Sequence, residues 1–243
     1  MIDTGKRSFI KAFTWRLVAV FLLGLVTFSI TSDWKTVTYV TAAYHIIQIG
    51  LYFLHERIWS YIMWGKTKGL FIQMTGMSGA GKTTLAMALS KRLNKRGFKV
   101  EVIDGDEYRK NLCKDLGFSK EDRNENIRRL SFVGKVLGRN GVVCLMSAIN
   151  PYDSVRQEIK ESNKESKLVY VKCDIDTLKG RDPKGLYKKA LLPDGHPEKI
   201  YNFTGISDPF ENPKSADLVL DTSVSTVQES LDQLEDFVLK NVR

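Results

Sequence analysis

The sequence predicts an α/β protein, a doubly wound parallel sheet of the phosphate-loop type, preceded by a two-helix transmembrane hairpin. Three observations support this fold class. From Leu70 onward, short apolar runs alternate with stretches of helical periodicity, which is typical of a parallel sheet with helices on both faces. The first apolar run leads directly into the glycine-rich stretch GMSGAGKTT, residues 76–84. Two long apolar stretches lie within the first 69 residues.

The two apolar stretches, at about residues 9–30 and 37–54, each approach the ~20 residues that a membrane-spanning helix needs. Polar residues interrupt both: Lys11, Arg16, His45 and Gln48. These side chains must reach the membrane interface or face the neighbouring helix. A cleaved signal peptide is a poorer explanation, because the first stretch is long and a second one follows it. A soluble helical hairpin used for dimerisation is the alternative interpretation.

Basic residues predict how this hairpin is oriented. Cations lie at the two outer ends of the pair: Lys6, Arg7, Lys11, Arg16, Arg57, Lys66 and Lys68. The turn between the stretches offers only Lys35, so both termini are expected to face the cytoplasm. Four tryptophans fall near the expected interfaces: Trp15, Trp34, Trp59 and Trp64. We therefore expect residues 1–65 to anchor the chain in membrane lipid. Residues 66–69 should form a short linker, and 70–243 a cytoplasmic domain close to the bilayer.

The distribution of charge argues against a nucleic-acid-binding protein, and the cysteine spacing argues against a cysteine-based metal site. Residues 1–69 hold eight Lys/Arg and three Asp/Glu, and so carry +5 of the net charge of +9. Because most of the excess lies beside the apolar stretches, where cations favour anionic lipid headgroups, we expect no nucleic-acid partner. Cys113, Cys144 and Cys173 show no CxxC pair and no metal-ligand spacing. They fit a reduced cytosolic setting.

The stretch GMSGAGKTT has the pattern of a loop that holds the phosphates of a nucleotide. Gly76 is followed, after four residues, by Gly81-Lys82-Thr83. Glycines permit a tight loop of backbone N–H donors, the lysine ammonium suits the β- and γ-phosphates, and the threonine hydroxyl suits Mg²⁺. A glycine-rich turn between a strand and a helix is the alternative.

Two further groups of polar residues follow predicted strands or lie on a helix. Asp104 and Asp106 come directly after the second strand, where ligands bind in parallel sheets. They could order Mg²⁺ or accept a proton from an attacking hydroxyl, or they could form an ordinary Asp-Gly turn. Arg109, Arg123, Arg128 and Arg129 surround Asn126 on or beside one helix. Arginine suits the recognition of phosphate or sulfate, whereas a solvated helix surface is the alternative.

Five motifs together resemble the adenylylsulfate kinase family: GMSGAGKTT, DGDEYR, LGFSKEDRNENIRR, RDPKGLYKKA and FTGISDPFENP. They occur in the family's order and approximate spacing over nearly all of residues 68–243. The segment YHIIQIGLYFLHERIWSYIMWG resembles part of a two-span membrane domain family of unknown function, over about residues 6–65. The first resemblance implies a phosphate-loop kinase that transfers the γ-phosphate of ATP to the ribose 3′-hydroxyl of adenosine 5′-phosphosulfate (APS). The second resemblance implies only an anchor.

The resemblance also implies roles for individual residues. ATP would be bound by Gly76, Met77, Ser78, Gly79, Ala80, Gly81, Lys82, Thr83, Thr84 and Arg181. Mg²⁺ would be held by Thr83 and Asp104, and the catalytic residues would be Lys82, Asp104 and Asp106. The acceptor would be bound by Arg109, Phe118, Arg123, Asn126, Ile149, Asn150, Lys184 and Phe203. The run 180–213 would form a lid that excludes water.

The chain departs from the family pattern at several positions. Glu107 replaces an uncharged amide, Asn150 replaces a serine known as a phosphorylated intermediate, and Asp153 replaces an arginine. The stretch LLPDGHPEK lengthens the lid. Added negative charge at residues 107 and 153 predicts repulsion of a dianionic acceptor. Two alternatives therefore stay open: a membrane-tethered kinase of another small nucleotide or sugar, and a non-catalytic nucleotide-sensing scaffold. The sequence is also compatible with a homodimer.

Overall fold

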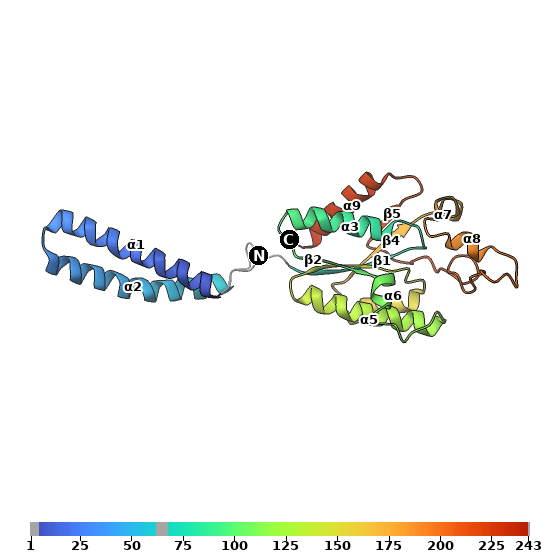
Figure 1. The fold of residues 1–243 in the computed structure, drawn as a ribbon, viewed down its shortest axis with the longest axis horizontal. Helices are drawn as coiled ribbons and strands as arrows, with labels where there is room; N and C mark the ends of the chain where they lie inside the picture. The colour runs from blue at the N-terminus through green and yellow to red at the C-terminus, as the bar shows by residue number, and fades with distance from the viewer. Residues whose placement is uncertain (1–4, 62–67, 243) are drawn as a thin grey trace. The chain divides into compact units, whose positions relative to one another are not determined.

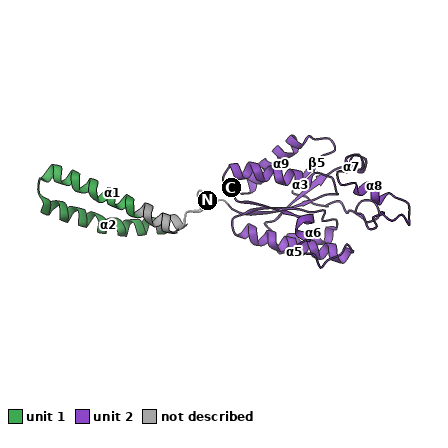
Figure 2. Ribbon diagram, in the orientation of Figure 1, with its two compact units in different colours: residues 1–66 green, residues 67–243 purple. Residues whose placement is uncertain are grey.

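The computed structural model describes residues 5–61 and 68–242 and divides the chain into two units, residues 1–66 and 67–243 (Figure 2). The first unit is a pair of helices, α1 (Gly5–Thr31) and α2 (Trp34–Tyr61). Both contain windows long and apolar enough to cross a membrane, Phe13–Thr31 and Trp34–His55. The second unit holds the glycine-rich loop and all the strands among the described residues.

Local capping explains why α2 begins earlier than hydropathy alone predicts. The Asp33 carboxylate accepts hydrogen bonds from the Lys35 amide at 3.1 Å and the Thr36 amide at 3.0 Å. Such a cap satisfies free N–H groups at the start of a helix. Further along, Arg16 of α1 donates to the Gln48 side chain of α2 at 2.9 Å. These two polar side chains thus face the neighbouring helix, as expected.

Several sequence predictions in the first unit concern residues whose side chains the structure does not describe. Trp64 and Lys66 lie outside the described residues, and so does part of the predicted linker. The side chains of Lys6, Arg7, Lys11 and Trp59 are also outside the description. Trp15 and Trp34 are both largely exposed on the helix surface. Their placement at a membrane interface stays a prediction.

The second unit is built on a five-stranded sheet in the order β2-β3-β1-β4-β5, with every pair parallel. The strands are β1 (Leu70–Thr75), β2 (Val100–Asp104), β3 (Val143–Ser147), β4 (Lys167–Lys172) and β5 (Leu218–Asp221). Helices α3 (Lys82–Lys95) and α9 (Val227–Asn241) cover one face, and α5 (Lys120–Arg139) and α6 (Asp153–Ser162) cover the other (Figure 1). The predicted doubly wound parallel sheet is confirmed.

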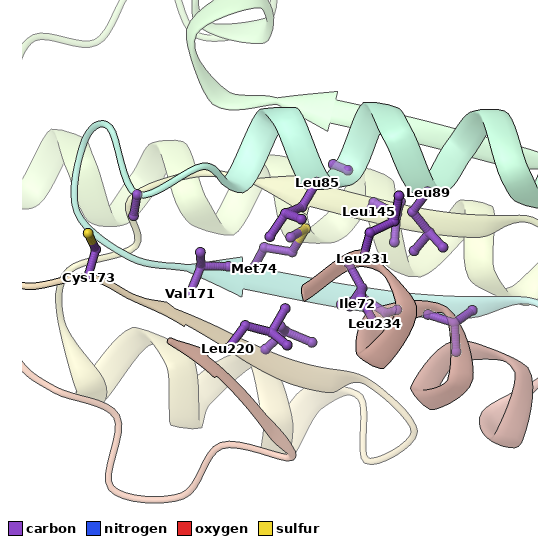
Figure 3. Close-up of a cluster of buried hydrophobic side chains, with 14 of the residues drawn as sticks. Ile72, Met74, Leu85, Leu89, Leu145, Val171, Cys173, Leu220, Leu231 and Leu234 are labelled. Atoms are coloured by element: carbon purple, nitrogen blue, oxygen red, sulfur yellow. The ribbon is translucent and has the colours of Figure 1, made fainter. Parts of the chain in front are cut away.

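Alternating residues of β1 bury the two faces of the sheet, as strand geometry requires. Ile72 and Met74 pack with leucines of α3 and α9 in the larger core (Figure 3). Phe71 points to the opposite face, into the smaller core beneath α5 and α6. A Cβ atom on Gly134 of α5 would lie 2.3 Å from the Phe71 ring, so glycine lets this helix approach the sheet closely. β1 is therefore held rigidly from both sides.

The structure differs from the sequence expectation in the short helices. The sequence pattern after the second strand predicts a helix at about residues 106–113, but in the structure this helix is only α4 (Gly105–Arg109), and turns follow it. The polar stretch between β4 and β5, residues 173–217, contains two helices that the sequence pattern does not predict, α7 (Ile175–Arg181) and α8 (Leu186–Ala190). Both are too short to display a hydrophobic period. A polar cap marks the start of α7, where the Asp174 carboxylate accepts from the Thr177 amide at 2.8 Å, whereas α8 follows Gly185 and has no side-chain cap.

Candidate active site

A cavity of about 650 Å³ opens where the carboxyl ends of β1, β2 and β3 meet. It brings together most of the site residues expected from the sequence: Ser78, Gly79, Gly81, Lys82, Thr83, Thr84, Asp104, Asp106, Arg109, Phe118, Arg123, Asn126, Ile149, Asn150, Lys184 and Phe203. Four expected residues do not line it: Gly76, Met77, Ala80 and Arg181. The first three belong to the loop that forms its wall.

The glycine-rich loop connects β1 to α3, as the sequence predicts. A Cβ atom on Gly76 would lie 2.3 Å from the Val171 carbonyl oxygen of β4, so only glycine fits against the sheet here. Gly81 has φ 96° and lies at the N-cap of α3, a left-handed conformation that glycine adopts without strain. The loop and the free N–H groups of the first turn of α3 form an anion-binding arrangement.

Lys82 is the first residue of α3, and its ammonium is buried beneath the loop. Its Nζ donates to the carbonyl oxygens of Gly76 at 2.8 Å and Met77 at 2.9 Å. Burial lowers the pKa of Lys82 to about 8, although the nearby Asp106 carboxylate favours the charged form. Phosphate groups bound in the loop would add negative charge and raise this pKa again. Lys82 is thus poised to become fully cationic when an anion arrives.

Three oxygen-bearing side chains gather beside the first turn of α3. Thr83 Oγ1 donates to Asp104 Oδ2 at 2.8 Å and lies 2.9 Å from Ser147 Oγ. The other carboxylate oxygen of Asp104 accepts from the amides of Asp106 and Glu107 at the start of α4. Asp104 therefore caps α4 and does not form an ordinary Asp-Gly turn, and its Oδ2 atom contacts Thr83 in the first turn of α3. The sequence assigned no role to Ser147, which ends β3 in register with Asp104 on the adjacent strand.

Two arginines and two aromatic rings line the other part of the cavity. The Arg109 guanidinium lies 4.6 Å from the centre of the Phe118 ring. Arg123 donates to the Phe118 carbonyl at 2.9 Å and also to the Asn202 carbonyl and the Thr204 hydroxyl. The loop after α4 and the loop at 202–208 are therefore joined through Arg123. Phe118 is two-thirds exposed and able to contact a ligand.

Phe203 and the two asparagines contribute buried surface to the same cavity. Phe203 packs edge-on against Tyr187, with ring centres 4.9 Å apart. Asn126 and Asn150 are both buried, and the side-chain carbonyl oxygen of each has no hydrogen-bond partner in the described part of the chain. Asn150 donates to the Gln73 side chain at 3.3 Å, a contact that the sequence did not reveal. Unpartnered buried oxygens are costly and indicate a place for a donor group.

Residues of the expected lid contact the glycine-rich loop and the Asp106 carboxylate directly. Lys184 Nζ lies 2.5 Å from Asp106 Oδ2, and the Tyr187 hydroxyl donates to the Ser78 carbonyl at 2.9 Å. Arg181 lies elsewhere: it donates to the Thr222 carbonyl at 2.6 Å, beyond the end of β5. The role expected for Arg181 in ATP binding stays a prediction.

The two additional carboxylates do not face the cavity. Glu107 is exposed and does not line it. Asp153 accepts from Arg156 Nε at 3.3 Å and Nη2 at 3.2 Å, and the Arg156 side chain is fully buried. Desolvation lowers the pKa of Arg156, and the Asp153 carboxylate opposes that effect. The charge of Asp153 therefore stabilises a buried arginine, and the repulsion expected from its sequence position has no geometric basis.

This pairing predicts that Asp153→Ala destabilises the fold. The substitution leaves the buried Arg156 guanidinium without its carboxylate, which costs about 3 kcal/mol when a buried pair is broken. Denaturant unfolding of the detergent-solubilised protein measures this loss. Glu158→Ala is the matched control, because the Glu158–Arg128 pair is about half exposed and contributes less than about 1 kcal/mol. Equal losses in both variants would contradict the assignment.

Two families match separate parts of the chain. The family described as adenylylsulphate kinase matches residues 68–221. A family described as predicted membrane protein (DUF2061) matches residues 9–60.

Individual relatives resemble the second unit. The chain is 46% identical over 167 residues to the probable adenylyl-sulfate kinase of Synechocystis sp. (strain ATCC 27184 / PCC 6803 / Kazusa), covering 69% of this chain and 92% of that protein. It is 49% identical over 163 residues to the probable bifunctional SAT/APS kinase 2 of Sorangium cellulosum (strain So ce56), covering 67% of this chain but 27% of that longer protein. Among solved structures, the Mycobacterium tuberculosis APS kinase CysC in complex with AMPPNP and APS is similar with a TM-score of 0.65 and 35% identity. The match covers 71% of this chain and 98% of that one.

Proposed function

This chain belongs to the adenylylsulfate kinase family, and we propose that it transfers the γ-phosphate of ATP to the ribose 3′-hydroxyl of adenosine 5′-phosphosulfate. The product is 3′-phosphoadenosine 5′-phosphosulfate. One observation carries the proposal: a phosphate-binding loop and a pocket of guanidinium and aromatic groups share a single cavity. The enzyme is an ATP-dependent kinase. The guanidinium and aromatic groups at the other end of the cavity form the acceptor pocket and support the identity of the acceptor.

The acceptor pocket matches the chemistry of APS. That molecule carries a phosphosulfate and a purine, which require planar cationic groups and flat apolar surfaces. Arg109 and Arg123 supply the cations, and Phe118 and Phe203 supply the rings. Asn126 offers an unpartnered oxygen to a ribose hydroxyl. Neither Glu107 nor Asp153 lines this pocket, which supports an anionic acceptor.

We assign the catalytic steps to five side chains. Lys82 would stabilise charge on the transferring phosphoryl group, and Asp106 would accept the proton of the attacking hydroxyl. Thr83 and Asp104 would hold Mg²⁺ with help from Ser147, since hydroxyl and carboxylate oxygens suit that ion. Mg²⁺, when bound, neutralises charge between the β- and γ-phosphates. No cluster of three or more His, Cys, Asp or Glu side chains with metal-binding geometry occurs among the described residues, so one carboxylate and the phosphates would share the ion.

Transfer in this protein is proposed to be direct, without a phosphoenzyme at residue 150. Asn150 has an amide in place of a hydroxyl, and its nitrogen is hydrogen-bonded to Gln73. In-line transfer requires no protein nucleophile, because positioning and electrostatic stabilisation supply the catalysis.

The direct test incubates the purified full-length protein in detergent with ATP, Mg²⁺ and APS and then separates the nucleotides. We expect 3′-phosphorylated APS to form and no labelled protein to accumulate from γ-labelled ATP. Robust phosphorylation of another nucleotide or sugar, with none of APS, would favour the alternative kinase. Nucleotide binding without turnover on any acceptor would favour the scaffold interpretation. A homodimer stays a prediction.

We further propose that residues 1–65 anchor the protein in the membrane with the kinase unit on the cytoplasmic side. Two apolar helices and the match to a predicted membrane protein family support the anchor, and the distribution of cations supports the orientation. Protease added outside intact cells should leave the kinase unit uncut, whereas permeabilised cells should show cleavage. Cleavage in intact cells would reverse the topology.

A further inference from the structure

The edge of the sheet where the strands begin lies opposite the active site and carries a row of cations. Because every strand pair is parallel, the residues that precede the strands all lie at this edge. Lys99 precedes β2, Arg139 ends α5 before β3, Lys68 precedes β1, and Lys164 precedes β4. These strands are neighbours in that order. The chain's C-terminus lies at the same edge, where the Lys68 amide donates to the Val242 carbonyl at 3.3 Å (Figure 1).

The ends of α3 and α9 extend this row. We define the amino-edge surface by six residues: Lys68, Lys95, Lys99, Arg139, Lys164 and Lys240. All six are exposed, and only Lys68 forms an ion pair among the described residues, with Glu165 at 2.8 Å. Glu161 and Asp236 lie near the same edge and do not cancel the excess of positive charge.

Helix dipoles account for only part of this arrangement. Cations are favoured in the last turn of a helix, which explains Lys95, Arg139 and Lys240. Lys68, Lys99 and Lys164 lie outside helices and gain nothing from a dipole. Like charges gathered on one face also repel one another, so a surface of this kind is stabilised by an anionic partner.

A cavity of about 360 Å³ opens at this edge and offers a place for an anionic group. Its lining includes Lys68, Lys135 and Arg139, together with Asn163 and Glu165. Lys135 Nζ donates to the Ser162 carbonyl at 2.6 Å, which fixes its ammonium beside the cavity. Both the charge and the volume suit a phosphate headgroup.

We propose that the amino-edge surface binds anionic phospholipid headgroups. The same chain carries two helices able to cross a membrane, and only residues 62–67 separate the end of α2 from Lys68. At ~3.3–3.6 Å per residue, that connection reaches at most about 25 Å. Lysine and arginine side chains gain attraction from an anionic leaflet within about a Debye length of ~10 Å. The surface would thus hold the kinase unit against the bilayer with its active site directed away from it.

The test uses the full chain reconstituted in lipid nanodiscs that carry a quencher on the headgroups. Neutral discs contain phosphatidylcholine alone, and anionic discs contain about 30% phosphatidylglycerol in addition. A fluorophore is attached at Asn140→Cys, an exposed position at the amino edge, or at Leu191→Cys, an exposed position in the lid. The native cysteines are buried and would not be labelled. We expect about threefold stronger quenching at residue 140 in anionic than in neutral discs, lost at about 0.5 M salt, and no such difference at residue 191.

A matched pair of charge variants distinguishes surface binding from tethering alone. In the triple variant Lys99→Glu, Arg139→Glu, Lys164→Glu, the fluorophore at residue 140 should be quenched no more strongly in anionic than in neutral discs. Its control, Lys110→Glu, Lys114→Glu, Lys188→Glu, changes exposed cations by the same net charge near the active-site edge and should behave as the parent. Equal quenching of the parent in both kinds of disc would overturn the proposal. So would retention of the anionic preference by the first triple variant. The salt dependence of the parent tests the proposal without any charge variant.

Discussion

Lys82→Ala is expected to reduce phosphoryl transfer by about 10³-fold, the size of effect seen when a donor to a developing negative charge is removed. The ammonium lies beneath the phosphate loop, and its present partners are the loop carbonyls of Gly76 and Met77. A phosphate bound in the loop would lie beside this positive charge, whereas the alanine side chain carries no charge. Steady-state turnover with saturating ATP and APS measures the loss. Lys91→Ala, which removes an exposed lysine from the same helix, should leave turnover unchanged.

The fold should survive this substitution, because the buried ammonium stabilises little by itself. The pKa of Lys82 is lowered to about 8 in the folded state, below its ordinary value of 10.5. Between these values the unfolded chain binds a proton that the folded chain has released. Stability therefore rises with pH across that window, and the cost of charging Lys82 is fully present below it. Alanine removes this cost but leaves the Gly76 carbonyl without a donor, while the Met77 carbonyl keeps the Ala80 amide at 3.3 Å. We therefore expect the melting temperature to stay within about 4 °C. Near-parental turnover in a folded variant would contradict the assigned role.

The parts of this site that were predictable from sequence are those in which neighbours in the chain are neighbours in space. The loop at residues 76–84 carries its own backbone donors, its lysine and its threonine in one segment. Asp104 ends β2 and Asp106 lies two residues beyond it, so topology alone places them at the carboxyl edge. Both predictions required only the local pattern and the rule for parallel sheets.

The parts that were not predictable depend on contacts between distant segments. Ser147 meets Thr83 only because β3 lies between β1 and β2, an order that the sequence does not state. Gln73 reads as one polar residue in an apolar strand, and its contact with Asn150 appears only in the folded chain. The charge of Asp153 was misinterpreted for a different reason. Arg156 lies three residues later on the same helix, and that spacing was a visible sign of pairing.

The second large effect is expected at Asp106, the carboxylate proposed to accept the proton of the attacking hydroxyl. Asp106→Asn should lower kcat by about 10²–10³-fold, because an amide cannot accept the proton of the attacking hydroxyl. The KM for ATP should change little, since the loop, Lys82 and the Thr83–Asp104 contact stay in place. Folding should also be unaffected, because the Asp106–Lys184 pair is more than half exposed and contributes less than about 1 kcal/mol.

Glu107→Gln is the matched control for this assignment. It removes the adjacent carboxylate of the same short helix, which is exposed and does not line the cavity. We expect its kcat and its KM for APS to stay within about twofold of the parent, because an exposed charge beyond the cavity is screened by solvent. An equal loss of kcat in both variants would contradict proton acceptance by Asp106, because it would show that the reaction depends only on the negative charge of this helix. A tighter KM for APS in Glu107→Gln would mean instead that this carboxylate repels the acceptor, as its position in the sequence first suggested.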